Sequence, residues 1–223
     1  MSDDSFIREV NEELRSEQMK TIWRRFGPFL IGGAVAVVLG TAAYMGYQHW
    51  VNSNANASGD KFLAALDLAE AGKNDEALAA LADLEKNGFG AYPVLARMRA
   101  AAVLADKGDT AAAVNAFDDI AADTAVPSPL RDVARLRAGY ILVDTGSYDD
   151  VAKRVEPLSA DGNPMRSSAR ELLGLAAWKA GRFDDAVKLF RQLADDPTAV
   201  ANIRQRANTM LELMRSAGIS VQG

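Results

Sequence analysis

Residues 180–187 read Ala-Gly-Arg-Phe-Asp-Asp-Ala-Val, and three upstream segments repeat this pattern of residue types. In each segment a glycine is followed within four residues by one or two acidic residues and then by alanine or valine, although in the second segment Asp109 follows Gly108 directly. The glycines are Gly72, Gly108, Gly146 and Gly181, which are 36, 38 and 35 residues apart. A period in this range is typical of a stacked helical solenoid.

The order of residues within each unit predicts two helices joined by a tight turn. Glycine ends the first helix, because it adopts the left-handed conformation of a helix C-cap at little cost. The acidic residues begin the second helix, where the positive end of the helix dipole favours them. Helix breakers separate the units at residues 88–93, 127–129 and 162–164 and at Pro197. Pro157 falls inside the second helix of the third unit, and predicts that this helix is short or kinked.

These units resemble the tetratricopeptide repeat, whose length is about 34 residues. The fourth unit carries most of the resemblance, through Leu173-Gly174, Gly181, Phe183, Ala186, Phe190 and Pro197. The third unit keeps Gly139, Gly146 and Tyr148, whereas the first two have Ala65 and Ala101 where the first glycine is expected. Alanine and leucine are abundant and no alternating β-branched run occurs, so the predicted fold is all-α, a helix-hairpin solenoid of degenerate repeats.

An apolar segment precedes the repeats. Residues 26–48 contain no charged side chain, and a helix of this length reaches roughly 35 Å, enough to cross a hydrocarbon core of about 30 Å. A buried core helix and a signal peptide are the alternatives, but the run is long and begins far from the first residue. Lys20, Arg24 and Arg25 precede the run, and the next cation is Lys61. This asymmetry predicts a cytoplasmic N-terminus and an extracytoplasmic C-terminal domain.

The predicted order of domains follows from these segments. Residues 1–25 form a cytoplasmic tail, 26–50 a transmembrane helix and 51–58 a linker. Residues 59–196 form four repeats, 197–217 a capping helix and 218–223 a tail. The composition of residues 52–58 favours a flexible tether over a continuation of the helix. Within the span, Gly32, Ala36 and Gly40 share one helix face, which fits either docking against another membrane helix or ordinary membrane-helix composition.

The composition argues against catalysis. The chain has no cysteine and one histidine, His49 beside the apolar run, so it lacks the parts of the usual nucleophilic and zinc sites. The pairs Asp149-Asp150 and Asp184-Asp185 could form a carboxylate dyad, but their repeated place at a helix start favours helix capping. A net charge of −5 argues against nucleic-acid binding. We therefore expect no enzyme activity, no cofactor and no metal.

The whole arrangement resembles the ancillary subunit of the bacterial Sec translocon, a family of single-pass inner-membrane proteins with a periplasmic repeat domain. The resemblance includes the lead into the membrane, Arg24-Arg25-Phe26-Gly27-Pro28-Phe29-Leu30. It implies a protein-binding adaptor whose partners are translocon subunits, periplasmic chaperones and exported chains. An envelope scaffold for cell division or outer-membrane assembly is the alternative, since related repeat domains serve there.

Repeats of this kind usually bind on the face formed by the first helix of each unit. Carried onto this sequence, that face comprises Phe62, Leu66, Met98, Ala102, Leu136, Tyr140, Glu171, Leu175 and Trp178. They would line a groove for an apolar segment, or they would pack between helices, which is the commoner role at this spacing. Tyr140 and Trp178 are the strongest candidates. Five arginines could meet an acidic partner or form a solvated helix face: Arg97, Arg99, Arg131, Arg135 and Arg137.

Overall fold

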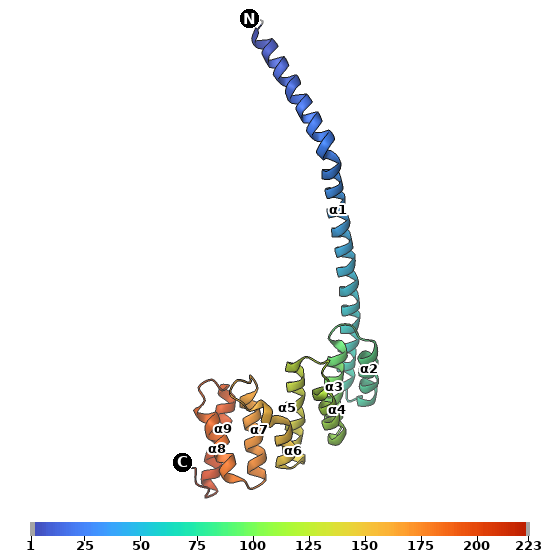
Figure 1. Ribbon diagram of the computed structural model, residues 1–223. Helices are drawn as coiled ribbons and strands as arrows, with labels where there is room; N and C mark the ends of the chain where they lie inside the picture. The colour runs from blue at the N-terminus through green and yellow to red at the C-terminus, as the bar shows by residue number, and fades with distance from the viewer. Residues whose placement is uncertain (1–2, 222–223) are drawn as a thin grey trace. The chain divides into compact units, whose positions relative to one another are not determined.

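The computed structural model describes the backbone of residues 3–221, with the side chains of residues 19, 20 and 23–221. It divides into two compact units, Met1–Asn56 and Ala57–Gly223. Residues 3–221 contain helices and no strand, as predicted (Figure 1). The helices are α1 Asp3–Glu70, α2 Asn74–Asn87, α3 Tyr92–Asp106, α4 Thr110–Ala122, α5 Ser128–Thr145, α6 Tyr148–Val155, α7 Arg166–Lys179, α8 Phe183–Asp195 and α9 Ala201–Ser216.

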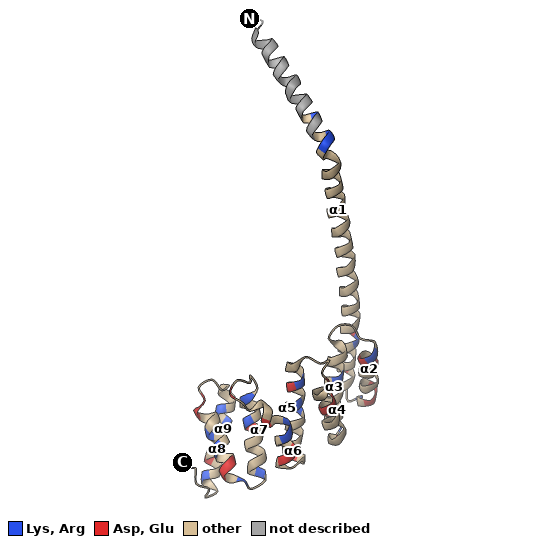
Figure 2. Cartoon of the chain, in the orientation of Figure 1, with Lys and Arg blue, Asp and Glu red and all other residues tan. Residues whose placement is uncertain are grey.

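The described residues of the first unit belong to α1. From Trp23 onward this helix is long and apolar enough to cross a membrane. Lys20, Arg24 and Arg25 are exposed ahead of the apolar stretch, and Figure 2 shows a long stretch of α1 directly after them without charged side chains. Pro28 lies inside α1, where it leaves one carbonyl without its helical donor.

Residues 51–58 are helical, which differs from the tether that their polar composition favoured. Two of the polar side chains form hydrogen bonds with backbone groups. The Asn54 side-chain amide donates to the Trp50 carbonyl at 2.8 Å, and buried Ser58 accepts a hydrogen bond from the Phe89 amide at 3.0 Å. Alternating Ala55 and Ala57 add helix propensity. Composition alone favoured a tether because it does not reveal these hydrogen-bond partners.

In the second unit, each hydrophobic cluster joins one helix pair to the first helix of the next pair. Consecutive helices from α2 to α9 pack against each other. The four clusters are centred on Ala65, Leu81, Leu84 and Val103 in α1–α3; Ala101, Phe117, Ile120 and Ala138 in α3–α5; Leu136, Val151, Val155 and Leu172 in α5–α7; and Ala177, Phe190, Leu193 and Ala207 in α7–α9. This shared packing is the solenoid arrangement that the repeats predicted.

The turns confirm most of the glycine predictions. Gly72, Gly108 and Gly181 have φ of 73°, 87° and 72°, in the left-handed region. Gly146 is extended instead, with φ −104°. The reason is the capping box that follows it: the Ser147 hydroxyl accepts from the Asp150 amide, and the Asp150 carboxylate accepts from the Ser147 amide at 3.0 Å. Asp150 is therefore a helix-capping residue.

Two further features follow from single residues. Pro157 lies in a 3-10 turn, Glu156–Leu158, and α6 ends at Val155, which confirms the predicted short helix. The predicted C-terminal tail is partly packed, since Ile219 and buried Val221 contact the α7–α9 cluster. The tail therefore extends the core beyond α9.

Glycine at the first repeat position permits close helix packing in the third and fourth units. A Cβ on Gly139 would lie 2.7 Å from Val155 Cγ1, and one on Gly174 would lie 2.9 Å from Phe190 Cζ. The corresponding Ala65 and Ala101 are fully buried, so the first two units accommodate a methyl group there. The difference between repeats is thus a difference in helix approach.

Candidate protein-binding face

One side of α3 and one side of α5 carry exposed side chains, namely Leu95, Arg137 and Tyr140. In α5, Ala134 and Ala138 face the preceding cluster and Leu136 faces the following one. The positions on these sides recur every three or four residues, as one helix face requires. We call them the α3–α5 face, which comprises exposed Leu95, Arg137 and Tyr140, half-buried Arg99 and Val133, and Ala102, which also packs against the cluster formed by α3, α4 and α5.

The two helices contribute to this face in the same repeat register. Residues 95, 99 and 102 precede Gly108 by the same distances as residues 133, 137 and 140 precede Gly146. Leu95 is 37% exposed and Tyr140 is 46% exposed, so each helix presents a large apolar side chain. An arginine accompanies the apolar residue on both helices. The face therefore combines apolar surface with positive charge.

Arg99 and Arg137 make no hydrogen bond or ion pair with any residue that the structure describes. The Nε atom of Arg99 is buried and has no acceptor. Two of the other predicted arginines are paired: Arg97 donates to Asp123 at 2.6 Å and Arg135 donates to Asp132 at 2.6 Å. The predicted arginine group therefore separates into paired and unpaired members.

Arg131 lies outside this face. Its Nε atom also lacks an acceptor, but its charge acts on Asp123. The pKa of Asp123 is lowered mainly by the hydrogen bond from Arg97, with a smaller attraction from Arg131. Arg131 thus belongs with the contacts between α3 and the α4–α5 turn.

Two of the predicted groove residues are buried. Leu136 is a core residue of the α5–α7 cluster. Glu171 is 4% exposed, and its carboxylate accepts hydrogen bonds from Arg206 Nε at 2.5 Å and Nη2 at 2.7 Å. This pairing raises the pKa of the Arg206 guanidinium, and Tyr140 is near enough to add a smaller contribution. Helix α9 therefore occupies the side of α7 that the sequence assigned to a partner.

The other predicted residues are half-buried, except Tyr140. Phe62 packs on Tyr92 with ring centroids 6.0 Å apart, and Trp178 packs on Phe183 at 5.2 Å. Leu66 is half-buried in α1, Met98 contacts the α3–α5 cluster, and Leu175 contacts the α7–α9 cluster. For most of this set the packing interpretation describes the structure better than the groove interpretation.

Sequence reasoning missed Leu95 and Leu213, which are both exposed. A signal for the face was present in the sequence: Arg99 and Arg137 stand at the same repeat position, 38 residues apart, as do Gly108 and Gly146. Residues four positions N-terminal to these arginines, Leu95 and Val133, complete the same helix face. The binding register stays a prediction, and the structure adds Leu95, Arg99 and Arg137 to Tyr140 as candidates.

The small residues of the apolar helix are open. Gly32, Ala36 and Gly40 are exposed, and a Cβ on either glycine would meet nothing within 4 Å. No described residue of the first unit covers this face, so docking of another helix there stays a prediction.

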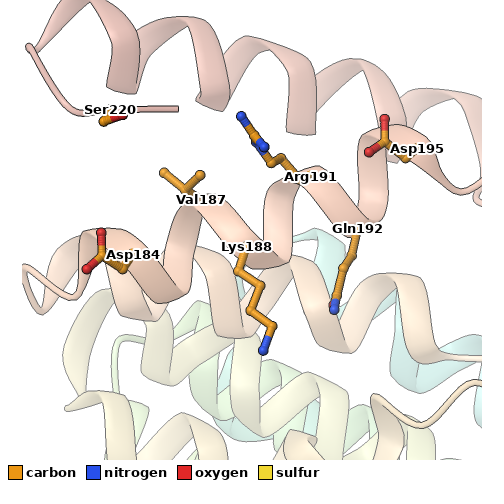
Figure 3. Close-up of a pocket in the computed structure, with 7 residues that line it drawn as sticks. All are labelled: Asp184, Val187, Lys188, Arg191, Gln192, Asp195 and Ser220. Carbon is orange, nitrogen blue, oxygen red and sulfur yellow. The ribbon is translucent and has the colours of Figure 1, made fainter. Parts of the chain in front are cut away.

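A shallow cavity of about 570 Å³ lies along α8. Figure 3 shows Val187 and Arg191 pointing toward the C-terminal segment that carries Ser220, whereas Lys188 and Gln192 point away from it. The lining mixes both charges, with Asp184 and Asp195 at its ends (Figure 3). Among the described residues, no group of three or more His, Cys, Asp or Glu side chains could hold a metal ion.

The tetratricopeptide repeat-like domain family has a model that matches residues 20–212. The chain belongs to this family. The matched range includes the apolar part of α1 as well as every helix from α2 to α9, at least in part. No curated protein matches the chain. Tetratricopeptide repeat-like domains are in general protein-interaction modules rather than enzymes. The α3–α5 face is the candidate interaction site on this member.

Proposed function

We propose that the protein is a membrane-anchored adaptor that binds other proteins through the α3–α5 face. One observation carries the proposal: a tetratricopeptide repeat-like domain exposes Leu95 on α3 and Tyr140 on α5, each on the same side of its helix as an unpaired arginine. Exposed apolar side chains grouped with unpaired charge are typical of interaction surfaces.

The proposed location is the bacterial inner membrane, with the N-terminus in the cytoplasm and the repeat domain in the periplasm. The cations Lys20, Arg24 and Arg25 before the apolar stretch support this orientation. The resemblance to the ancillary translocon subunit supports a role beside the export channel. Translocon subunits, periplasmic chaperones and exported chains are then the partners.

Site-specific crosslinking tests the binding face in intact membranes. A photoreactive amino acid replaces Tyr140, and a matched control places the same group at Gln192 on α8. We expect protein adducts from position 140 and few from position 192. Adducts of equal yield at both positions, or none at position 140, would refute binding through this face.

Copurification of the intact protein in mild detergent tests the role. Recovery of channel subunits together with periplasmic chaperones supports the translocon role. Recovery of division or outer-membrane assembly factors supports the envelope scaffold instead. Protease added to spheroplasts tests the orientation, because a periplasmic repeat domain is digested whereas a cytoplasmic one is protected.

A further inference from the structure

We infer that the α3–α5 face takes an acidic amphipathic segment of a partner protein, one that presents apolar and carboxylate side chains on the same side. This inference rests on the proposed function and specifies its ligand. The partner's carboxylates pair with Arg99 and Arg137, and its apolar side chains cover Leu95 and Tyr140.

The unpaired arginines are the first argument. Buried polar groups in folded proteins nearly always have partners, because an unsatisfied donor loses hydration without compensation. Arg99 has such a donor in its Nε atom. The chain carries more acidic than basic residues, with a net charge of −5, yet no described carboxylate reaches Arg99 or Arg137. A partner carboxylate would supply the acceptor that Arg99 Nε lacks among the described residues, and would pair with exposed Arg137.

Other arginines of the repeat domain pair with carboxylates on neighbouring helices and so stabilise the fold. Arg154 bonds Asp118, with its closest contact at 2.6 Å, and Arg206 makes a two-point contact with Glu171. Guanidinium groups favour this planar, two-point recognition of carboxylates. Arg99 and Arg137 thus differ from the fold-supporting arginines in the absence of that contact.

The spacing on the helices is the second argument. Leu95 and Arg99 lie four residues apart on α3, and Arg137 and Tyr140 lie three apart on α5, so each helix offers one apolar and one cationic side chain on the same face. Asp106 and Asp144 continue that face at the C-terminal ends of the two helices. A bound segment is therefore expected to place its carboxylates toward Arg99 and Arg137 and away from these aspartates.

Anionic lipid is the other class of ligand that two arginines could attract. The Leu95 and Tyr140 side chains favour a protein segment, because apolar side chains on a helix face complement the side chains of a peptide. A phospholipid headgroup would engage the charges alone. The two classes are separated by the experiment.

The experiment uses the full-length protein in nanodiscs of neutral lipid. The probes are two fluorescent amphipathic peptides of equal length, one built from Leu and Glu and the other from Leu and Gln. Fluorescence anisotropy measures the binding of each. We expect the Glu peptide to bind about tenfold more tightly than the Gln peptide, a difference that raised salt diminishes.

The double variant Arg99→Gln/Arg137→Gln should abolish the difference between the two peptides. The matched control, Lys153→Gln/Lys188→Gln, removes the same charge from exposed positions on α6 and α8 and should preserve it. Helical circular dichroism and thermal unfolding establish that both variants are folded. Equal binding of the two peptides, binding of neither, or equal effects of the two double variants would overturn the inference.

Two further outcomes separate this inference from its alternatives. Arginine-dependent binding to vesicles containing anionic lipid, without binding to the Glu peptide, would assign the face to lipid and overturn the inference. Crosslinks from position 140 that persist unchanged in the arginine double variant would leave the proposed adaptor role standing and remove only the acidic ligand.

Discussion

The α3–α5 face and the corresponding side of α7 occupy the same place in their repeats but meet different surroundings. Arg137 of α5 corresponds to Leu172 of α7, since both precede their turn glycine by the same number of residues. Arg137 is exposed, whereas Leu172 is fully buried. Helix α7 contacts both α5 and α9 directly, and α3 and α5 make no comparable contact within the described residues. The same repeat position is therefore buried in α7, near the C-terminal end of the array, and exposed in α5, near its middle.

The comparison shows that equivalent helix sides in a degenerate repeat array can be either buried or exposed. Gly139 and Gly174 each allow close packing of the two helices of their own unit. Helix α5 nevertheless keeps Arg137 and Tyr140 exposed, whereas α7 is contacted by α9. The contact with α9, rather than the repeat glycine, therefore distinguishes the closed side from the open one.

The largest expected effect comes from the matched pair Leu172→Ala and Arg137→Ala. Removing Leu172 from a fully packed site should cost about 2–5 kcal/mol of unfolding free energy. The Arg137 substitution should change it by less than about 0.5 kcal/mol, because the side chain is exposed and unpaired. Urea unfolding of both variants measures the difference. Similar losses would mean that the two positions are equivalent after all.

The ion pair that closes the face of α7 gives the second prediction. Arg206→Ala leaves the buried Glu171 carboxylate without its two donors and should cost about 2–3 kcal/mol. Hydrogen exchange should rise first in α9, because that helix loses its tie to α7. The exposed pair of Arg215 and Glu212 supplies the control: Arg215→Ala should cost less than about 1 kcal/mol. An unchanged exchange rate in α9 would show that the pair does not hold this helix.

The two aromatic residues predicted from the sequence should now behave differently. Trp178→Ala removes a half-buried ring from the α7–α9 cluster and from Phe183, and should cost about 2 kcal/mol of stability. Tyr140→Ala should cost less than about 1 kcal/mol, and should weaken peptide binding in the nanodisc assay instead. A stability loss at Tyr140 equal to that at Trp178 would place Tyr140 in the core and remove it from the binding face.

Replacing a glycine where two helices pack closely should change the stability by a smaller amount, and in the direction opposite to that expected from helix propensity. Alanine usually stabilises a helix relative to glycine by about 1 kcal/mol. Gly139→Ala should instead destabilise the protein by about 1 kcal/mol, since its Cβ would meet Val155 and Leu172. The matched change Gly162→Ala lies in a turn where a Cβ meets nothing within 4 Å. Thermal unfolding compares the two, and a more stable Gly139→Ala protein would show that the helices can separate without cost.

The sequence predicted the helix pairs well, because turns and caps are local: glycine, proline and paired acids act within a few residues of themselves. The binding face was harder to predict. Which side of α5 stays exposed depends on how closely α7 and α9 pack to it. The distances between these helices cannot be read from the sequence. Glu171 illustrates the limit, because its partner Arg206 lies 35 residues away on the capping helix. The helical state of residues 52–58 was missed for a similar reason, since Ser58 bonds Phe89 across the fold.

The smallest expected effect is the loss of stability at low pH. It tests whether the region of α3 and α4 and the region of α7 and α8 are destabilised together. The pKa of Asp123 is lowered mainly by the hydrogen bond from Arg97 of α3, and the pKa of Asp196 mainly by the hydrogen bonds of Thr198. Both folded-state values lie below the ordinary 3.8. The stability that each carboxylate contributes is therefore present above that pH and is lost as the pH falls through the folded value.

Two variants separate the regions. Asp123→Asn should reduce the acid sensitivity of amide exchange in α3 and α4, and Asp196→Asn should reduce it in α7 and α8, because each ties different helices together through Arg97 or Arg166. The control Asp184→Asn, at an exposed first-turn position, should leave both regions as sensitive to acid as the parent protein. Amide hydrogen exchange is measured from above the ordinary aspartate pKa of 3.8 to below it, and gives the change in protection of each helix. If either variant altered both regions equally, the open face and the closed end would unfold as one cooperative unit, and the structural difference between them would not extend to their stability.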